Sequence, residues 1–405
     1  MKSAIFITLS IAMGMLCLLP SDIYLPALPL IQQYFDSSTS LIQMTLSVFL
    51  LGTAASQFLI GPFVDFYNLK AIGIVSVTIF LIATLICAIT TSIEVMIIAR
   101  FFQACGAGFA AVISRAAVTK NYDSQKAAHV YLIMSPILAV SPAIAPVIGG
   151  NLSKFLGWRS VFIFIFILGI LILIGIWKFF AVKQTSSPAK EDLHPFKIIK
   201  NYLDILRNKC FSGYLLTRCA VDASYFAYIT ASPFIFHTLG YSTIQIGNFY
   251  IIPIISFVGA AYLTKRLMDK YSKDLLMLIG LLISIFGGIV LYLIGITHYY
   301  YALQIILPAA IMTAGYGFTG SLSWTEAMAQ FPASQSGSVS SLIGFFPLIA
   351  ASLAAALVNI LTHGSVSRLA IFMVILLSLA TLILLKVIRF KTEKKQLKMN
   401  SDPYN

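Results

Sequence analysis

Twelve apolar stretches divide the sequence, and this repeated pattern constrains the fold more than any other feature. Crossing about 30 Å of hydrocarbon takes roughly 20 apolar residues in a helix. The stretches are too long and too uniformly apolar for the roughly ten-residue alternating strands of a membrane barrel. They cover residues 5–34, 41–66, 71–90, 93–118, 128–153, 160–181, 211–237, 243–264, 274–295, 299–325, 336–361 and 367–388. We therefore predict an all-α membrane protein with twelve transmembrane helices.

The composition excludes a soluble fold. Hydrophobic residues make up 59% of the chain and charged residues only 10%, whereas charged residues form about a quarter of a typical soluble domain. The mean hydropathy is +0.92. A water-soluble fold of 405 residues could not bury this much apolar surface.

The net charge of +13 follows the membrane topology. If the N-terminus is cytoplasmic, 22 of the 27 Lys and Arg residues fall on the cytoplasmic side. Lys154, Arg159 and Arg368 fall outside, and Arg100 and Arg218 lie within segments. This bias is typical of the positive-inside rule, so we expect both termini in the cytoplasm and no nucleic-acid site.

The cysteines and histidines show no metal or disulfide pattern. An odd number of cysteines lies scattered in or beside apolar segments, which argues against a disulfide framework. The five histidines are scattered without metal-ligand spacing. The first apolar run is too long for a signal peptide, and we interpret it as a retained span.

A polar, basic stretch separates six spans from six. Its portion "PFKIIKNYLDIL" has apolar residues at helical spacing and predicts a short amphipathic helix on the inner membrane face. Two pseudo-equivalent halves are the plan of many secondary transporters. The expected division is 1–182 for the first half, 183–209 for the linker, 210–390 for the second half and 391–405 for a cytoplasmic tail.

Asp22 is the best candidate for a proton site. It lies inside the first span between Pro20 and Pro26, with Pro29 close behind. A charged side chain in a span needs a partner or a watery cavity, and prolines that expose carbonyl groups are tolerated where they line such a cavity. The alternative is a carboxylate that caps a broken helix or lies in the outer headgroup layer.

Arg100 and Gln103 are candidates for the substrate cavity. They lie one helical turn apart in the fourth span, where Arg100 would hold Asp22 ionised or bind a substrate anion. The alternative is a structural guanidinium group that backbone carbonyls satisfy.

Arg218 and Asp222 lie four residues apart on one face of the seventh span. Either the two charges neutralise each other, or Asp222 titrates as a second coupling site while Arg218 faces the cavity. Tyr24 and Tyr225 are candidates for stacking walls of the cavity, although aromatic residues in membrane helices more often pack or face lipid.

Four stretches resemble a known family. They are "SDIYLPALP", "FVDFYNLK", "IIARFFQACGAGFAA" and "SPAIAPVIGG", and they resemble the major facilitator superfamily, in particular its Bcr/CflA-type drug:proton antiporters. The resemblance implies that Asp22 is the proton-coupling acid and that Arg100 and Gln103, with Gly106, form the motif of the fourth span.

The resemblance also implies gating and packing motifs. Gly61, Asp65 and Lys70 match the loop between the second and third spans, with Arg115 as a possible partner of Asp65, but Phe66 and Asn68 depart from the family pattern. In the fifth span the antiporter signature falls on Pro142, Pro146, Gly149 and Gly150, with Ser141 and Ala145 where glycines are commoner.

We therefore expect a proton-coupled secondary transporter with the major facilitator fold, built from two pseudo-symmetric six-helix halves. It would export small amphipathic compounds across the bacterial inner membrane by alternating access. The alternatives are export of an endogenous metabolite such as a siderophore, or proton-coupled import. We expect a monomer that is not an enzyme, with a small-molecule substrate, protons and the lipid bilayer as its partners. No cofactor is expected, and the proton gradient is the expected energy source. ATP is not implied, since no GxxxxGK[ST] loop appears.

Overall fold

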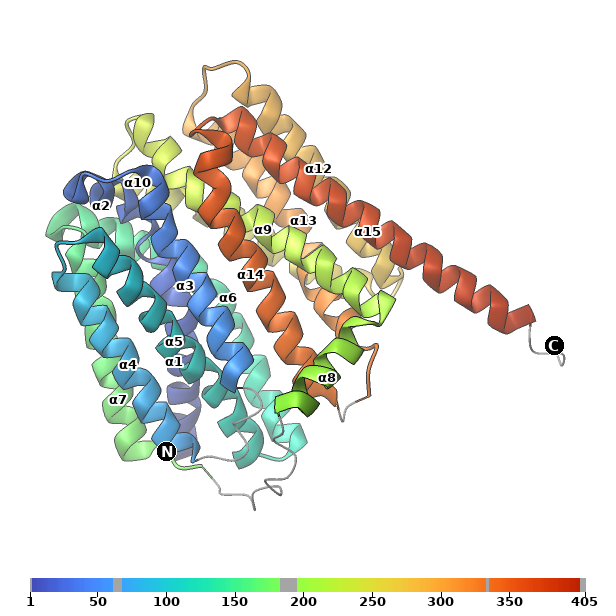
Figure 1. Cartoon of the computed structure of the whole chain (residues 1–405). Coiled ribbons are helices and arrows are strands. Elements are labelled where there is room, and N and C mark those ends of the chain that lie inside the picture. The colour runs from blue at the N-terminus through green and yellow to red at the C-terminus, as the bar shows by residue number, and fades with distance from the viewer. Residues whose placement is uncertain (1, 61–67, 183–194, 333–334, 401–405) are drawn as a thin grey trace.

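The chain folds into two helical bundles that lie side by side (Figure 1). A computed structural model describes residues 2–60, 68–182, 195–332 and 335–400. All regular structure in these ranges is helical. The apolar segments predicted from the sequence all coincide with helices, most with bounds that agree within a few residues.

The first bundle contains the six expected helical units of the N-terminal half. Its first unit has three pieces, and the other five are single helices. They are α1 Lys2–Asp22, η1 Leu25–Ala27, α2 Leu28–Phe35, α3 Thr39–Ile60, α4 Leu69–Ile89, α5 Ile93–Asn121, α6 Ser124–Leu156 and α7 Arg159–Phe179.

The second bundle contains the corresponding units of the C-terminal half. They are α9 Lys209–Thr238, α10 Thr243–Phe249, α11 Ile251–Leu267, α12 Lys273–Gly295, α13 Ala302–Met328, α14 Ser336–Thr362 and α15 Val366–Asn400. In the sequence, α8, Pro195–Leu206, lies between the two halves, in the segment expected to form an amphipathic helix. It contacts α9 and α14. Helix α15 continues past its neighbours into the segment expected to be a tail (Figure 1).

The two halves repeat one packing pattern. In the first half α4 packs against α5 and α7, and α1 packs against α5 and α7. In the second half α12 packs in the same way against α13 and α15, and α9 against α13 and α15. Spans 1, 3, 4 and 6 of each half thus have equivalent neighbours, which is the pseudo-symmetry predicted from the segment count.

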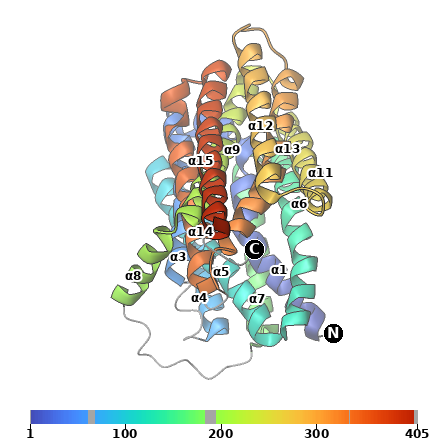
Figure 2. The ribbon, with the colours of Figure 1, turned by 90° about the vertical axis from the view of Figure 1, so that its right-hand side faces the viewer.

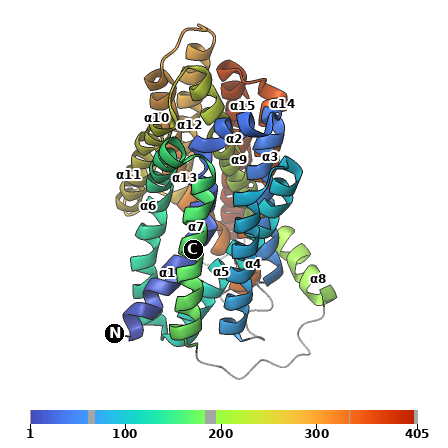
Figure 3. The same ribbon diagram turned by 90° about the vertical axis from the view of Figure 1, so that its left-hand side faces the viewer.

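One end of the molecule, called here the basic end, carries the chain start, α8 and the lysines at the ends of α4, α7, α9 and α12. Figures 2 and 3 show the chain start and α8 toward the same lower end. Polar caps begin several helices here, since Asn68, Asn208 and Ser272 accept backbone N–H groups of α4, α9 and α12.

The two halves are joined most firmly toward the opposite end. Direct hydrogen bonds between them link Gln33 to His237, Ser40 to Asn359, Gln43 to Thr230, Ser47 to Ser352 and Gly150 to Thr243. Toward the basic end, α3 and α14 stay in contact through Phe58 and Phe345, whose ring centroids lie 4.7 Å apart. Helix α8 packs against this contact, with the rings of Tyr202 and Phe58 5.2 Å apart.

Two spans are broken where the halves meet. The first breaks after Asp22, and short helices restart at Leu25 and Leu28 with prolines in their first turns. The second break lies at Tyr250 between α10 and α11, close to Pro253, which has no N–H to bond the carbonyl of Phe249. The short helices η1 and α10 contact each other. The break at Tyr250 was not predicted.

Ten helical units in the described residues are long and apolar enough to cross a membrane. Helices α6 and α9 are not among these ten, although they have 33 and 30 residues. Large apolar side chains such as Ile82, Leu171 and Phe286 are more than half exposed on the outside of the bundles, as expected of surfaces that face lipid. The count of twelve crossings stays a prediction.

Candidate functional site

The break in the first span brings Asp22 to the contact between the halves. Asp22 is the last residue of α1, and the following η1 contacts α6, α9 and α10. As a whole residue Asp22 is only partly buried, whereas the residues from Ile23 to Pro29 are buried. Its neighbour Ser21 donates a hydrogen bond to Asp22 Oδ1 at 3.3 Å. The carboxyl group therefore lies between helices rather than on the lipid-facing wall.

Tyrosines of the second half lie near Asp22. The carboxyl group is close enough to interact electrostatically with the hydroxyl groups of Tyr225 in α9 and of Tyr250 at the second helix break. Tyr225 and Tyr228 lie one helical turn apart, and the Tyr225 ring meets the Tyr316 ring edge-on at 6.1 Å. The first half thus provides an acid, and the second half provides a cluster of phenol groups opposite it.

Two of these four hydroxyl groups have local hydrogen-bond partners. Tyr316 shares a hydrogen bond of 2.9 Å with Ser224, and Tyr250 shares one of 2.8 Å with Ser232. The Tyr228 hydroxyl is buried and has no hydrogen-bond partner among the described residues. A buried hydroxyl without a partner costs free energy unless another group satisfies it.

Sequence reasoning missed Tyr250 and Tyr316. The only signal for Tyr250 was Pro253, three residues after the break. The signal for Tyr316 was the glycine-rich stretch around it, where Gly315 lies against the carbonyl of Gly280 and Gly317 against that of Phe257. Both close approaches fix α13 between its neighbours and direct Tyr316 toward α9.

Arg218 and Asp222 form the ion pair that their spacing predicted. Arg218 Nε donates to Asp222 Oδ2 at 2.8 Å, and Nη1 donates to the carbonyl of Gly320 at 2.7 Å. Their side chains are 28% and 21% exposed, so the pair retains contact with water. Asp222 also acts electrostatically on Tyr225 and Tyr316.

Arg100 was expected to line the cavity, but its side chain has no exposed surface in this conformation. Its guanidinium carbon lies 4.1 Å from the Tyr24 ring centroid and 4.3 Å from that of Phe49. Nη1 donates to the carbonyl of Pro20 at 3.2 Å and to Gln103 Oε1 at 2.6 Å. The broken span supplies this free carbonyl, and the stacked rings remove the guanidinium from water.

Gln103 and Tyr24 are also buried completely, so neither lines a cavity in this conformation. Gln103 donates to the Thr84 hydroxyl at 2.8 Å, and Tyr24 shares a hydrogen bond of 3.2 Å with Thr45. The expected cavity positions are therefore corrected: the polar groups of Tyr24, Arg100 and Gln103 are directed into the first half.

The fifth-span signature packs against the broken first span of its own half and against α10 of the other half. A side chain at Gly149 would meet the carbonyl of Ile23, directly after Asp22, and one at Gly150 would meet the carbonyl of Thr243 in α10. The carbonyl of Pro146 lies in the same way against Gly247, and Pro142 is only partly buried. Glycine at these positions lets α6, η1 and α10 meet backbone to backbone.

The expected gating loop is described only at its end. Gly61 and Asp65 lie outside the described residues. Lys70 stands in the first turn of α4, where Asn68, one of the two residues that depart from the family pattern, caps the helix. Arg115 is exposed, and its backbone carbonyl accepts a hydrogen bond from the Tyr131 hydroxyl at 2.8 Å.

Comparison with known proteins decides the family. Residues 10–355 match the Major Facilitator Superfamily. The chain belongs to this superfamily. It is therefore a multi-pass membrane transporter and not an enzyme. In the described residues, no group of three or more His, Cys, Asp or Glu side chains is arranged to hold a metal ion.

Its relatives include several drug-resistance proteins. Multidrug resistance protein D of Escherichia coli (strain K12) is 24% identical over 378 residues, which cover 92% of each chain. The Bicyclomycin resistance protein homolog of Haemophilus influenzae is 27% identical over 290 residues, which cover 70% of this chain and 72% of the relative. These relatives support the resemblance to Bcr/CflA-type antiporters.

Solved transporters confirm the fold. A bacterial homolog of the human lysosomal transporter Spinster, in an inward-facing and occupied conformation, aligns with a TM-score of 0.77 at 19% sequence identity. The alignment covers 96% of this chain and 97% of that one. The predicted major facilitator fold is therefore correct.

Proposed function

We propose that this transporter exports a small amphipathic compound in exchange for protons, with Asp22 as the group that carries the proton. The observation that supports this most directly is the position of Asp22. It is an acidic residue, only partly buried, at the break of a membrane-spanning helix, and it lies near the tyrosines of the other half. Discontinuous helices that meet between two repeats are the usual place for substrate and coupling-ion sites in secondary transporters.

The contacts between the halves determine which side supplies water to Asp22. The seal formed by Gly150 and Thr243 lies between Asp22 and the opposite end of the molecule. Water would therefore reach the carboxylate from the basic end. Because basic residues concentrate on the cytoplasmic side of membrane proteins, we assign the basic end to the cytoplasm, with both termini there and the protein in the bacterial inner membrane.

The transport cycle follows from one site with alternating access. In the conformation described here, substrate would enter from the cytoplasm and contact Tyr225 and Tyr228 while the Asp22 proton leaves inward. Separation of α6 from α10 would then open the site outward, and reprotonation of Asp22 would release the substrate. One charge that crosses 100 mV contributes about 2.3 kcal/mol, enough for roughly fiftyfold accumulation.

Asp222 is the second proposed coupling group, with Arg218 as its counter-ion. The pair is partly exposed, and its charges act on the same tyrosine cluster as Asp22. A proton on Asp222 would release Arg218 for an anionic or hydrogen-bonding part of the cargo. Arg100 and Gln103 would act from behind the site by positioning the broken first span.

The test is proton-coupled transport by the purified chain in liposomes, with bicyclomycin as the probe because one relative is named for resistance to it. Asp22→Asn should abolish bicyclomycin movement driven by a pH gradient while the protein still inserts. Asp36→Asn is the matched control, because Asp36 is exposed and has φ 45°, a conformation that Asn accepts well. Undiminished pH-driven transport in the Asp22→Asn variant would remove Asp22 from the mechanism.

The same liposomes separate the alternative functions. Drug-driven proton movement in the direction opposite to the drug indicates antiport, whereas movement of both in one direction indicates an importer. A metabolite exporter would not transport bicyclomycin across the liposome membrane. Its own substrate would accumulate in cells that lack the gene. A single species in detergent with the mass of one chain would support the proposed monomer.

A further inference from the structure

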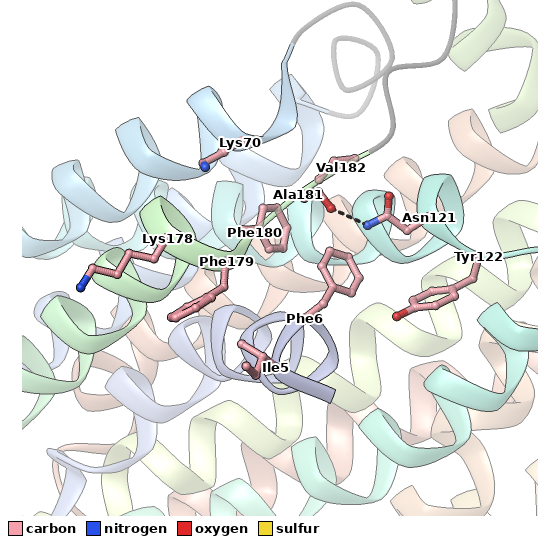
Figure 4. Close-up of a pocket in the computed structure, with 10 residues that line it drawn as sticks. All are labelled: Ile5, Phe6, Lys70, Asn121, Tyr122, Lys178, Phe179, Phe180, Ala181 and Val182. Carbon is pink, nitrogen blue, oxygen red and sulfur yellow. Dashed lines mark hydrogen bonds between the residues drawn. The ribbon is translucent and has the colours of Figure 1, made fainter. Parts of the chain in front are cut away.

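A cavity of about 580 Å³ lies at the basic end of the first half, away from the site between the halves. It is lined by Ile5, Phe6, Lys70, Asn121, Tyr122, Lys178 and the residues from Phe179 to Val182 (Figure 4). Its volume falls in the range of ordinary small-molecule sites, about 300–1,000 Å³. The lining comes from the ends of α1, α4, α5 and α7.

The inner wall of this cavity is aromatic and ordered. The rings of Phe6 and Phe180 stack with centroids 5.2 Å apart, and Phe6 meets Tyr122 edge-on at 5.8 Å. Asn121 donates to the carbonyl of Ala181 at 2.8 Å and so ties the chain after α7 to α5. Packing of α1, α5 and α7 therefore forms the wall.

The cavity carries two lysines and opens beside lipid-facing side chains. Figure 4 shows Lys70 and Lys178 on one side of the cavity and Asn121 and Tyr122 on the other. Lys178 follows Trp177, which is 65% exposed, and precedes Phe179, which is 53% exposed. An exposed tryptophan such as Trp177 marks the level of the lipid headgroups.

In the second half, the lysines at the equivalent helix ends have carboxylate partners. These helix ends carry an ion-pair network in which Lys391 binds Asp274 Oδ2 and Glu326 Oε2, each at 3.1 Å. Lys273 binds the other Glu326 oxygen at 3.0 Å, and the Tyr214 hydroxyl donates to Asp274 at 2.6 Å. Each cation of this network therefore has a carboxylate partner from its own half.

The first half has positive charge at the equivalent places. Lys70 is the second residue of α4, as Asp274 is of α12, and Lys178 lies near the end of α7, whose counterpart α15 carries Lys391. Among the described residues, neither Lys70 nor Lys178 has an ion-pair partner. The first half therefore has two lysines, Lys70 and Lys178, at positions where the second half has a lysine bound to carboxylates.

We propose that this cavity binds the headgroup of an anionic phospholipid of the inner leaflet, with its phosphate at Lys70 and Lys178 and acyl carbons along Ile5 and Phe179. The lipid phosphate would replace the carboxylates that the second half provides itself. This occupant fits the positive charge, the apolar wall and the headgroup level together. The proposal is independent of the cargo and direction of transport.

The test titrates the purified full-length chain in detergent with dioleoylphosphatidylglycerol, dioleoylphosphatidylcholine or inorganic phosphate, and counts bound molecules by native mass spectrometry. Each lysine near an anionic lipid strengthens binding about fivefold. Lys70→Gln/Lys178→Gln should therefore weaken the tightest phosphatidylglycerol site about thirtyfold and leave phosphatidylcholine binding unchanged.

The matched control is Lys265→Gln/Lys270→Gln, which removes two exposed charges from the same end of the second half and should keep the tight site. Lys70→Arg/Lys178→Arg should also keep it, which guards against a Gln variant that misfolds. Equal weakening in the cavity variant and the control would overturn the proposal. So would displacement of the lipid by an equal concentration of inorganic phosphate.

Acidic residues of this chain outside the described ranges are the remaining occupants to exclude. Asp65→Asn and Glu191→Gln/Asp192→Asn should leave lipid affinity unchanged or raise it. If either variant lowers the melting temperature in lipid-free detergent as much as the lysine variant does, the lysines are paired within the chain and the proposal is wrong.

Discussion

Arg100 Nη1 donates to the carbonyl of Pro20 at 3.2 Å, two residues before Asp22. Arg100 belongs to the fourth span and Asp22 to the first, so the fourth span holds the segment that carries the acid. The guanidinium is stacked between Tyr24 and Phe49. Its role in this conformation is to position the broken span that carries the acid.

Arg100→Lys should therefore impair both stability and transport. A lysine keeps the positive charge but loses the planar group that stacks between two rings and the hydrogen bond to Gln103. The combined loss should be about 2–3 kcal/mol, seen as a fall in melting temperature together with slower bicyclomycin transport. Arg159→Lys is the control, because Arg159 also lies against two rings but near the opposite end and partly exposed. A fully active, fully stable Arg100→Lys variant would contradict this role.

The ion pair in α9 should show strong coupling between its members. Arg218→Ala and Asp222→Ala each leave one charge in the membrane without its partner, which should destabilise the chain by about 3 kcal/mol. The double variant removes both charges and should recover most of that loss. Melting temperatures of the four proteins give the coupling energy, and transport rates give the functional role. A double variant as active as the wild type would confine the pair to folding.

Much of this arrangement could be predicted from the sequence. The helical spans follow from runs of apolar residues, and the Arg218–Asp222 pair follows from a four-residue spacing on one helix. The break beside Asp22 follows from Pro20, Pro26 and Pro29, which disturb the helix wherever they stand.

Contacts between distant spans could not be predicted. The sequence shows that Arg100 lies in the membrane, but only the packing of Tyr24 and Phe49 shows that it is enclosed rather than exposed. Tyr250 and Tyr316 join the site because α10 and α13 approach α9, and no local pattern in either helix encodes that approach. The contrast between Lys70 and Lys178 at the basic end and the ion-pair network of the second half likewise depends on the folded structure of both halves.

The close approach of α6 should be needed for closure at the opposite end. A valine at Gly150 would overlap the carbonyl of Thr243 in the other half, and overpacking of this kind costs about 1–3 kcal/mol. Gly150→Val should therefore favour the conformation that is open at this end. Spin labels at Gln33 and His237, which are hydrogen-bonded in the closed form, should move apart in double electron–electron resonance. Gly259→Val is the control, because nothing lies within 4 Å of a side chain added there. Unchanged distances in the Gly150→Val variant would show that α6 does not control the seal.

A reversible cross-link between α3 and α14 should stop the cycle if the halves must separate at this end. Ser47 and Ser352 each donate to the other's backbone carbonyl at 2.8 Å, and their hydroxyl oxygens lie 3.1 Å apart. Ser47→Cys/Ser352→Cys, made in a chain whose five native cysteines are replaced by serine or alanine, should therefore form a disulfide on mild oxidation. Oxidation should reduce transport by more than tenfold, and a reductant should restore it. Each single cysteine variant should be insensitive to the oxidant. Full transport by the cross-linked protein would mean that α3 and α14 stay together throughout the cycle, and that any opening occurs between α6 and α10 alone.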